Sequence, residues 1–208
     1  MARLEWGATG ERLFEAGIDQ CVLYVGANNG VAWSGLTGIT ESNSNPAPRP
    51  FYIDGYKYLN LDTSGNYQAT LTALAAPEEF AECEGNGELY AGFFATAQRR
   101  SEFGLSYRTR VGNDVAGIDH GYKLHLVYNC LASPSDTARA TIADTTAPVM
   151  KSWSITTRPP LVSGFRPTAH FVIDSTKVDT AELEGILYGD ALKSSRMPTV
   201  DELIALFS

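Results

Sequence analysis

The sequence lacks any apolar run long enough to cross a membrane, and nothing in it predicts export. A membrane-spanning helix needs about 18 to 20 consecutive apolar residues, and every apolar run here is far shorter. Residues 1–14 show neither an apolar stretch nor a cleavage pattern, so no secretory signal is expected. We therefore expect a single domain of 208 residues that is made in the cytoplasm and has no membrane partner.

Cysteine is scarce, and charge is sparse and mostly negative. Cys21, Cys83 and Cys130 are odd in number and lack metal-ligand spacing, so we expect buried free thiols. Charged residues make up only 19% of the chain, which suggests that partners cover part of the surface. The formal net charge of −8 argues against general affinity for nucleic acid, because neutralising phosphates requires clustered lysine and arginine.

Catalytic and metal-binding signatures are also missing. The sequence contains no G-x-S-x-G elbow, no Walker lysine and no G-x-G-x-x-G fingerprint. The spacing of His120, His125 and His170 matches no zinc pattern, so we interpret them as ordinary turn or strand residues. Residues 113–119 lack the spacing of a calcium loop, and a surface turn is favoured there. We predict that the chain is not an enzyme and has no cofactor and no metal site.

The sequence does contain many strand patterns. Alternating or apolar runs predict strands within 17–25, 31–39, 51–61, 67–74, 89–97, 103–114, 121–131, 148–159 and 167–174. The segments 51–61 and 67–74 are predicted to pair as a hairpin joined around Gly65 and Asn66. A helical turn is expected after Pro77.

Two short helices are predicted near the end of the sequence. The segment 179–189 places Asp179 and Glu182 at capping-box spacing, and 199–207 repeats the device with Thr199 and Glu202. The predicted fold class is therefore mainly β, a β-sandwich or partly open barrel with short flanking helices.

The strand over 103–111 combines an apolar face with a basic one. Phe103, Leu105, Tyr107, Thr109 and Val111 alternate with Gly104, Ser106, Arg108 and Arg110. Residues 99–110 carry four arginines against Glu102, whereas residues 78–88 are acidic with no base.

This charge segregation has two interpretations. The two charged faces pair within one chain, or the basic face of one protomer meets the acidic face of the next, as in a heterologous interface. The candidate interface residues are Arg99, Arg100, Arg108, Arg110, Glu78, Glu79, Glu82 and Glu84. The pairs Glu78/Glu79 and Glu82/Glu84 could also supply the acid and base of a glycosidase if the fold placed them across a cleft. A solvated or interface role for these carboxylates is favoured over catalysis.

Several segments resemble the major tail proteins of long-tailed bacteriophages with flexible, non-contractile tails. The resemblance covers nearly the whole chain in the same order, through 30–42, 52–61, 103–135, 152–159, 167–175, 183–189 and 197–207. It implies a tail-tube fold over 1–208, with an N-terminal arm of about residues 1–16 and a C-terminal helical segment of about 179–208. No motif in these segments is catalytic, so the resemblance implies an architecture and no active site.

The resemblance also implies a function and partners. Such subunits form hexameric rings whose inner strands join into one β-barrel, and the stacked rings form the conduit for double-stranded DNA. The implied partners are further copies of the chain and the tail terminator, tape measure and tail-tip proteins. The implied location is the virion, after assembly in the host cytoplasm.

The resemblance assigns roles to two groups of residues. The loop 41–50 is the candidate ring-stacking loop, with Glu41, Ser42, Asn43, Asn45, Pro46 and Arg49. Arg108 and Arg110 are expected to face a neighbouring protomer, since arginines on the lumen would bind DNA phosphates.

Two other classes of function remain open from the residues. A carbohydrate-binding or adhesin-type β-sandwich module of the virion could use Phe51, Tyr52, Tyr56 and Tyr58 as a stacking platform, although core or interface packing is favoured for them. A jelly-roll hydrolase is disfavoured by the small number of candidate catalytic groups.

Overall fold

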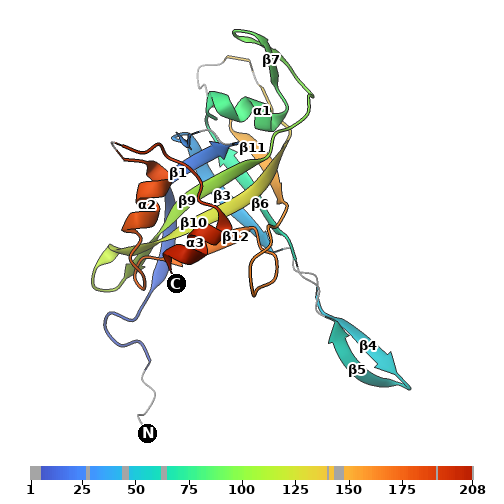
Figure 1. The fold of residues 1–208 in the computed structure, drawn as a ribbon, viewed down its shortest axis with the longest axis vertical. Helices are drawn as coiled ribbons and strands as arrows, with labels where there is room; N and C mark the ends of the chain where they lie inside the picture. The colour runs from blue at the N-terminus through green and yellow to red at the C-terminus, as the bar shows by residue number, and fades with distance from the viewer. Residues whose placement is uncertain are drawn as a thin grey trace.

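The computed structural model describes residues 6–26, 29–43, 47–61, 65–139, 141–142, 148–190 and 192–207. These residues are organised around an eight-stranded antiparallel sheet with the order β2-β1-β9-β10-β11-β6-β3, and β12 pairs with β10. The sheet curls around a core without closing into a barrel within these residues, and short helices flank it (Figure 1). The predicted mainly β class is confirmed.

The strands and helices fall into three groups: the large sheet, two separate hairpins and the helical elements. The large sheet contains β1 (Phe14–Val25), β2 (Val31–Ala32), β3 (Leu36–Asn43), β6 (Tyr67–Ala73), β9 (Phe103–Asn113), β10 (Gly117–Pro134), β11 (Lys151–Thr157) and β12 (His170–Asp174). Two separate hairpins are formed by β4 (Arg49–Ile53) with β5 (Tyr56–Leu61) and by β7 (Gly87–Tyr90) with β8 (Phe93–Ala95). The helical elements are η1 (Glu78–Phe80), α1 (Ala81–Glu84), α2 (Ala181–Tyr188) and α3 (Val200–Leu206).

The concave side of the sheet holds the larger hydrophobic core. Phe80 is fully buried there, with its ring centroid 4.6 Å from that of Trp33, 5.3 Å from Phe103 and 5.2 Å from Trp153. Aromatic rings at such separations attract one another beyond the area they bury. The η1–α1 segment is therefore fixed to the sheet by one aromatic anchor.

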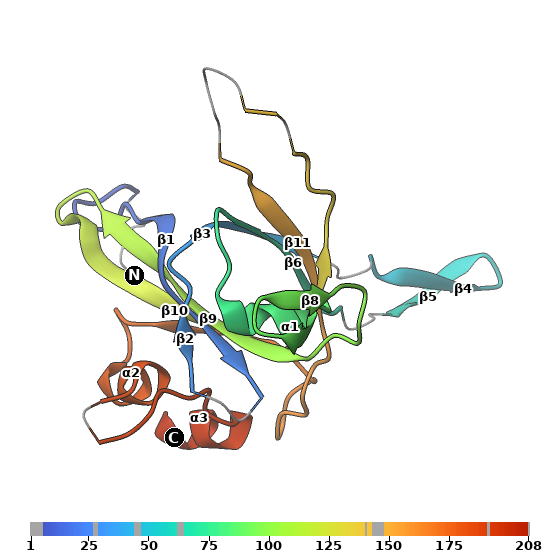
Figure 2. The same cartoon turned by 90° about the horizontal axis from the view of Figure 1, so that it is seen from above.

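The side of β9 that carries Ser106 and Arg108 is covered by helices rather than exposed to solvent. Helices α2 and α3 pack Leu183, Leu187 and Leu203 against this side, beside Leu124 and Leu126 of β10. Figure 2 shows both helices below β9 and β10, on the side away from β3 and β6. Ser106 and Arg108 consequently lie beneath these helices. The alternating pattern of β9 predicts which residues share a face, but it does not predict whether a helix covers that face.

The two predicted C-terminal helices are present, but only one has the predicted cap. At α3, Thr199 and Glu202 form the reciprocal capping box. At α2 the N-cap is Thr180, and the Asp179–Glu182 capping box does not form. The Thr180 hydroxyl is instead engaged by Tyr122 and Glu184, while Asp179 accepts a hydrogen bond from the Ala181 amide.

The predicted hairpin between 51–61 and 67–74 is wrong. β5 pairs with β4, and β6 pairs with β3 and β11. The reversal occurs at Asp54 and Gly55, whose φ angles are 50° and 80°. Two positive φ values are typical of a type I′ turn, for which Asp-Gly is a preferred sequence.

The predicted loop 41–50 is partly strand. Glu41, Ser42 and Asn43 belong to β3, and Arg49 begins β4, because both segments join antiparallel ladders. Asn45 and Pro46 lie outside the described residues. Strand β1 begins at Phe14, within the segment of about residues 1–16 that the resemblance assigns to an N-terminal arm.

The three cysteines are buried and free, as predicted. Burial raises the pKa of the Cys83 thiol to about 12 and raises the pKa of Cys21 and Cys130 as well.

Among the described residues, every helix is too short or too polar to span a bilayer.

Candidate functional site

The most prominent surface feature is the projecting hairpin, which we define as β4–β5, residues Arg49–Leu61. It stands away from the rest of the molecule in both views (Figures 1 and 2). Every one of its strand residues is exposed, and Tyr56 and Tyr58 reach 81% and 69% exposure. Its large exposed apolar side chains are Phe51, Tyr52, Ile53, Tyr56, Tyr58, Leu59 and Leu61.

These exposed aromatic side chains exclude the core-packing interpretation. A two-stranded hairpin is at best marginally stable alone in water, and concentrated exposed apolar surface marks interaction sites. The favourable Asp54–Gly55 turn specifies the hairpin locally, and every residue of its two strands is exposed. The projecting hairpin therefore has the properties of a docking arm.

A second apolar hairpin, β7–β8, lies at the other end of the molecule. Leu89, Tyr90, Phe93 and Phe94 are all exposed on it. Figure 1 shows β7 beyond α1 at the top, whereas β4 and β5 lie at the bottom. The sequence predicted a continuous strand over 89–97, and the reversal at Ala91 and Gly92, where Gly92 has a φ of 78°, was missed.

The predicted acidic interface residues divide into two sets. Glu78, Glu79 and Glu82 are exposed and line a groove of about 660 Å³ together with Arg99. Glu84 instead points inward, where its Oε1 accepts a 2.5 Å hydrogen bond from the Trp153 indole. Three of the four predicted interface acids thus share a groove with Arg99, one of the four predicted interface arginines. Glu84 instead forms a hydrogen bond within the chain.

Of the remaining arginines, Arg100 lies on the surface and Arg108 and Arg110 pair within the chain. Arg100 donates to the Ser133 hydroxyl at 2.7 Å. Arg108 Nε lies 2.6 Å from Asp19 Oδ1, and Arg110 Nε lies 2.7 Å from Asp19 Oδ2. Only 10% of the Arg108 side chain is exposed, so little of it remains accessible to another protomer. Contact between these arginines and a neighbouring subunit stays a prediction.

Asp19 is the common ion-pair partner of Arg108 and Arg110, the two arginines on β9. Asp19 is the direct cross-strand partner of Arg108, and the Arg108 guanidinium also lies 4.6 Å from the centre of the Tyr122 ring. The hydrogen bond from Arg108, supported by Arg110, lowers the pKa of Asp19 despite its partial burial. The sequence signal was a single carboxylate within the mostly apolar run 17–25.

Replacing Asp19 with asparagine is expected to destabilise the fold by about 2 kcal/mol, because Arg108 would remain buried without a counter-charge. Urea denaturation at pH 7 measures this effect. Because the folded pKa of Asp19 lies below the unfolded value of about 3.9, the difference between wild type and Asp19→Asn should be full at neutral pH. It should shrink as the pH falls through the lowered folded pKa.

A matched control is available in the exposed ion pair between Glu102 and Arg158, whose side chains are 46% and 74% exposed. Glu102→Gln should change the unfolding free energy by less than about 0.5 kcal/mol. Equal effects of Asp19→Asn and Glu102→Gln would contradict the assigned role of Asp19.

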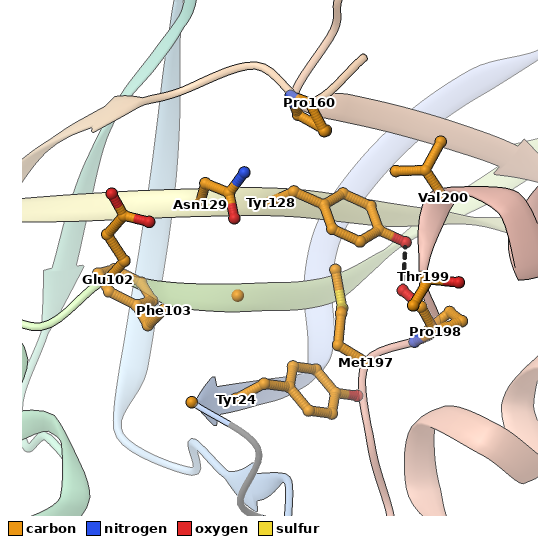
Figure 3. Close-up of a pocket in the computed structure, with 12 residues that line it drawn as sticks. Tyr24, Glu102, Phe103, Tyr128, Asn129, Pro160, Met197, Pro198, Thr199 and Val200 are labelled. Atoms are coloured by element: carbon orange, nitrogen blue, oxygen red, sulfur yellow. Dashed lines mark hydrogen bonds between the residues drawn. The ribbon is translucent and has the colours of Figure 1, made fainter. Parts of the chain in front are cut away.

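A groove of about 430 Å³ lies where the C-terminal segment crosses β10 (Figure 3). Tyr128 donates a 3.0 Å hydrogen bond to the Pro198 carbonyl, and Met197 lies between Tyr128 and Tyr24. Burial raises the pKa of both tyrosines, which therefore remain protonated donors. Glu102 is the single carboxylate among the lining residues, and it pairs with Arg158. The hydrogen bond from Tyr128 of β10 to Pro198, just before α3, holds the start of this helix against the sheet.

Comparisons with known proteins give weak structural likenesses only. No family model and no curated protein matches the chain. The chain is similar to one in the cryo-EM structure of the anti-feeding prophage baseplate, with 10% identity, a TM-score of 0.41, and coverage of 84% of this chain and 100% of that chain. It is also similar to one in the sheath/tube terminator structure of an extracellular contractile injection system, with 11% identity, a TM-score of 0.35, and coverage of 83% and 99%. At these values neither likeness assigns a function.

Proposed function

We propose that this chain is a structural virion protein that polymerises as stacked hexameric rings into a phage tail tube, the conduit for double-stranded DNA. The proposal rests on the resemblance of its sequence segments to major tail proteins. The observation that carries it in the structure is the projecting hairpin, whose two strands expose seven large apolar side chains to solvent. The proposed role involves no catalysis.

The placement of the two hairpins supports head-to-tail stacking. The projecting hairpin and β7–β8 lie at opposite ends of the molecule, and both expose aromatic side chains (Figure 1). Contact between two different surfaces of identical subunits is heterologous, and such contacts propagate unless they close into a ring. The projecting hairpin is thus suited to reach a copy in the next ring.

The edges of the large sheet support lateral joining within a ring. β2, at one edge, has only two residues, so residues 14–20 of β1 pair with β9 alone among the described strands. β3 forms the other edge and pairs only with β6 within the described part of the chain. Unpaired strand edges readily accept another strand, and a continuous ring would remove them.

The negative charge of the chain supports passage of DNA without retention. A formal charge of −8 on each subunit, repeated around and along a channel, repels the phosphate backbone. Basic walls would instead bind DNA through counterion release. The proposed partners are copies of the chain and the terminator, tape measure and tail-tip proteins that cap or fill such a tube.

Electron microscopy tests the proposal directly. Purified wild-type protein at increasing concentration should form rings or hollow rods of constant diameter in negative stain, with a matching rise in mass by light scattering. A chain that remains a monomer at every concentration, including after addition of preformed tail tips, would contradict a tube subunit.

The exposed tyrosines favour one alternative, a carbohydrate-binding module of the virion. Tyr56 and Tyr58 could stack on sugar rings, since neither is covered by the chain itself. A monomer that binds glycans through the projecting hairpin would support this alternative, whereas a tube subunit should bind none.

A further inference from the structure

Two histidines and a glutamate that are far apart in sequence meet on the concave side of the sheet. Glu41 lies on β3, His125 on β10 and His170 on β12. Their ligand atoms all lie within 4.8 Å of one another. His125 Nδ1 is 3.0 Å from His170 Nε2 and 3.8 Å from Glu41 Oε1. The sequence spacing alone gave no sign of this cluster.

The separations approach those of a tetrahedral metal site. With bonds of about 2.0 to 2.2 Å, neighbouring ligand atoms around a zinc ion lie about 3.3 Å apart. The two distances from His125 Nδ1, 3.0 Å and 3.8 Å, bracket that value. The third separation, between His170 and Glu41, is at most 4.8 Å, and side-chain rotation that shortens it would bring three ligand atoms onto one ion.

Hydrogen bonds on the far side of His125 fix its tautomer. The Thr109 hydroxyl donates its one proton to Glu15 Oε1 at 2.6 Å, because a carboxylate can only accept. Thr109 must therefore accept at 3.0 Å from His125 Nε2, which carries the ring proton. The lone pair of His125 is then on Nδ1, directed into the cluster. Metal-ligating histidines are typically oriented in this way by their second nitrogen.

Glu41 and the imidazole rings are held by tyrosines. Tyr107 donates a 2.5 Å hydrogen bond to Glu41 Oε1 and stacks on His125 with its ring 4.6 Å away and 9° from parallel. Tyr67 lies 3.2 Å from the Tyr107 hydroxyl and packs its ring 4.4 Å from His170. All three candidate ligands are thus oriented before any ion binds.

We propose that Glu41, His125 and His170 form a binding site for a divalent transition-metal ion of the zinc class, with its remaining position open to water. Two imidazoles and one carboxylate suit such ions better than calcium or magnesium, which prefer oxygen ligands alone. The site does not depend on the proposed role in a tail.

The ion would connect β3 to the paired strands β10 and β12, neither of which pairs with β3 within the described ranges. β3 is an edge strand and leads, after Asn43, towards the projecting hairpin, while β12 pairs only with β10 among the described strands. A bound ion would therefore fasten the edge strand β3 to β10 and β12.

Cobalt provides a visible probe for the site. Protein prepared without a polyhistidine tag and stripped by a chelator should take up about one Co²⁺ per chain, with the absorption of four-coordinate cobalt, and Zn²⁺ should displace it. His170→Gln and Glu41→Gln should each weaken binding at least about tenfold. Zinc should also raise the Tm of the wild type by several degrees and leave the Tm of His170→Gln unchanged.

His120 supplies the matched control, since it is exposed and lies outside the cluster. His120→Gln should bind cobalt as the wild type does. Failure of the folded wild type to take up cobalt would overturn the site, as would unchanged binding by His170→Gln or Glu41→Gln. If His170→Gln does not fold, Glu41→Gln and the wild type decide the question, because Glu41 is exposed and its replacement removes no core volume.

Discussion

Replacing Tyr56 and Tyr58 together with aspartate is expected to abolish assembly while leaving the monomer folded. Both side chains are exposed, so the unfolding free energy should stay within about 0.5 kcal/mol of the wild-type value. In an assembled tube the two new carboxylates would be buried in an apolar contact, at a cost of several kcal/mol for each contact. Because each contact recurs at every subunit, rods should disappear in negative stain and the scattering mass should fall to that of a monomer.

Phe165 provides a matched control for this double variant. It is 80% exposed and lies outside both hairpins, so Phe165→Asp makes the same kind of change elsewhere on the surface. Phe165→Asp should assemble normally. Tubes of normal length formed by Tyr56→Asp/Tyr58→Asp would show that the projecting hairpin is not the docking arm.

Phe80→Ala is expected to lower the unfolding free energy by about 4 kcal/mol. Its ring is fully buried and contacts Trp33, Phe103 and Trp153, so truncation would leave a cavity that three rigid rings cannot fill. The loss should be visible in urea denaturation as a lower midpoint with an unchanged slope. Since Phe80 ends η1, the acidic segment should also become more accessible to protease.

Two further variants isolate the cavity effect. Phe80→Leu retains part of the volume and should cost clearly less than Phe80→Ala. Phe165→Ala removes an exposed ring and should leave the unfolding free energy within about 0.5 kcal/mol of wild type. A change below about 1 kcal/mol for Phe80→Ala would contradict its role as the anchor of the η1–α1 segment.

The sequence predicts those features of the fold that local chemistry determines. The α3 capping box follows from Thr199 and Glu202, and the turn after Pro77 follows from the start signal of a helix. Strand patterns located most of the large sheet, and the free, buried state of the three cysteines followed from their odd number and their lack of metal-ligand spacing. These signals are carried by residues close together in the chain.

Features that depend on distant segments were not predictable. The pairing of β6 with β3 and β11, rather than with β5, is decided by sheet topology. The covering of Arg108 by helices and its pairing with Asp19 join segments separated by 89 positions. The cluster of Glu41, His125 and His170 likewise arises only when three strands meet, because no spacing rule applies to it.

The burial of Cys21, Cys83 and Cys130 has a practical consequence for chemical labelling. Alkylating reagents attack the thiolate, which these inaccessible side chains do not offer under native conditions. The variant Tyr56→Cys would then carry a single thiol accessible to maleimides. Neighbouring copies could be cross-linked or spectroscopically labelled at that one place, with the native sulfur atoms left untouched.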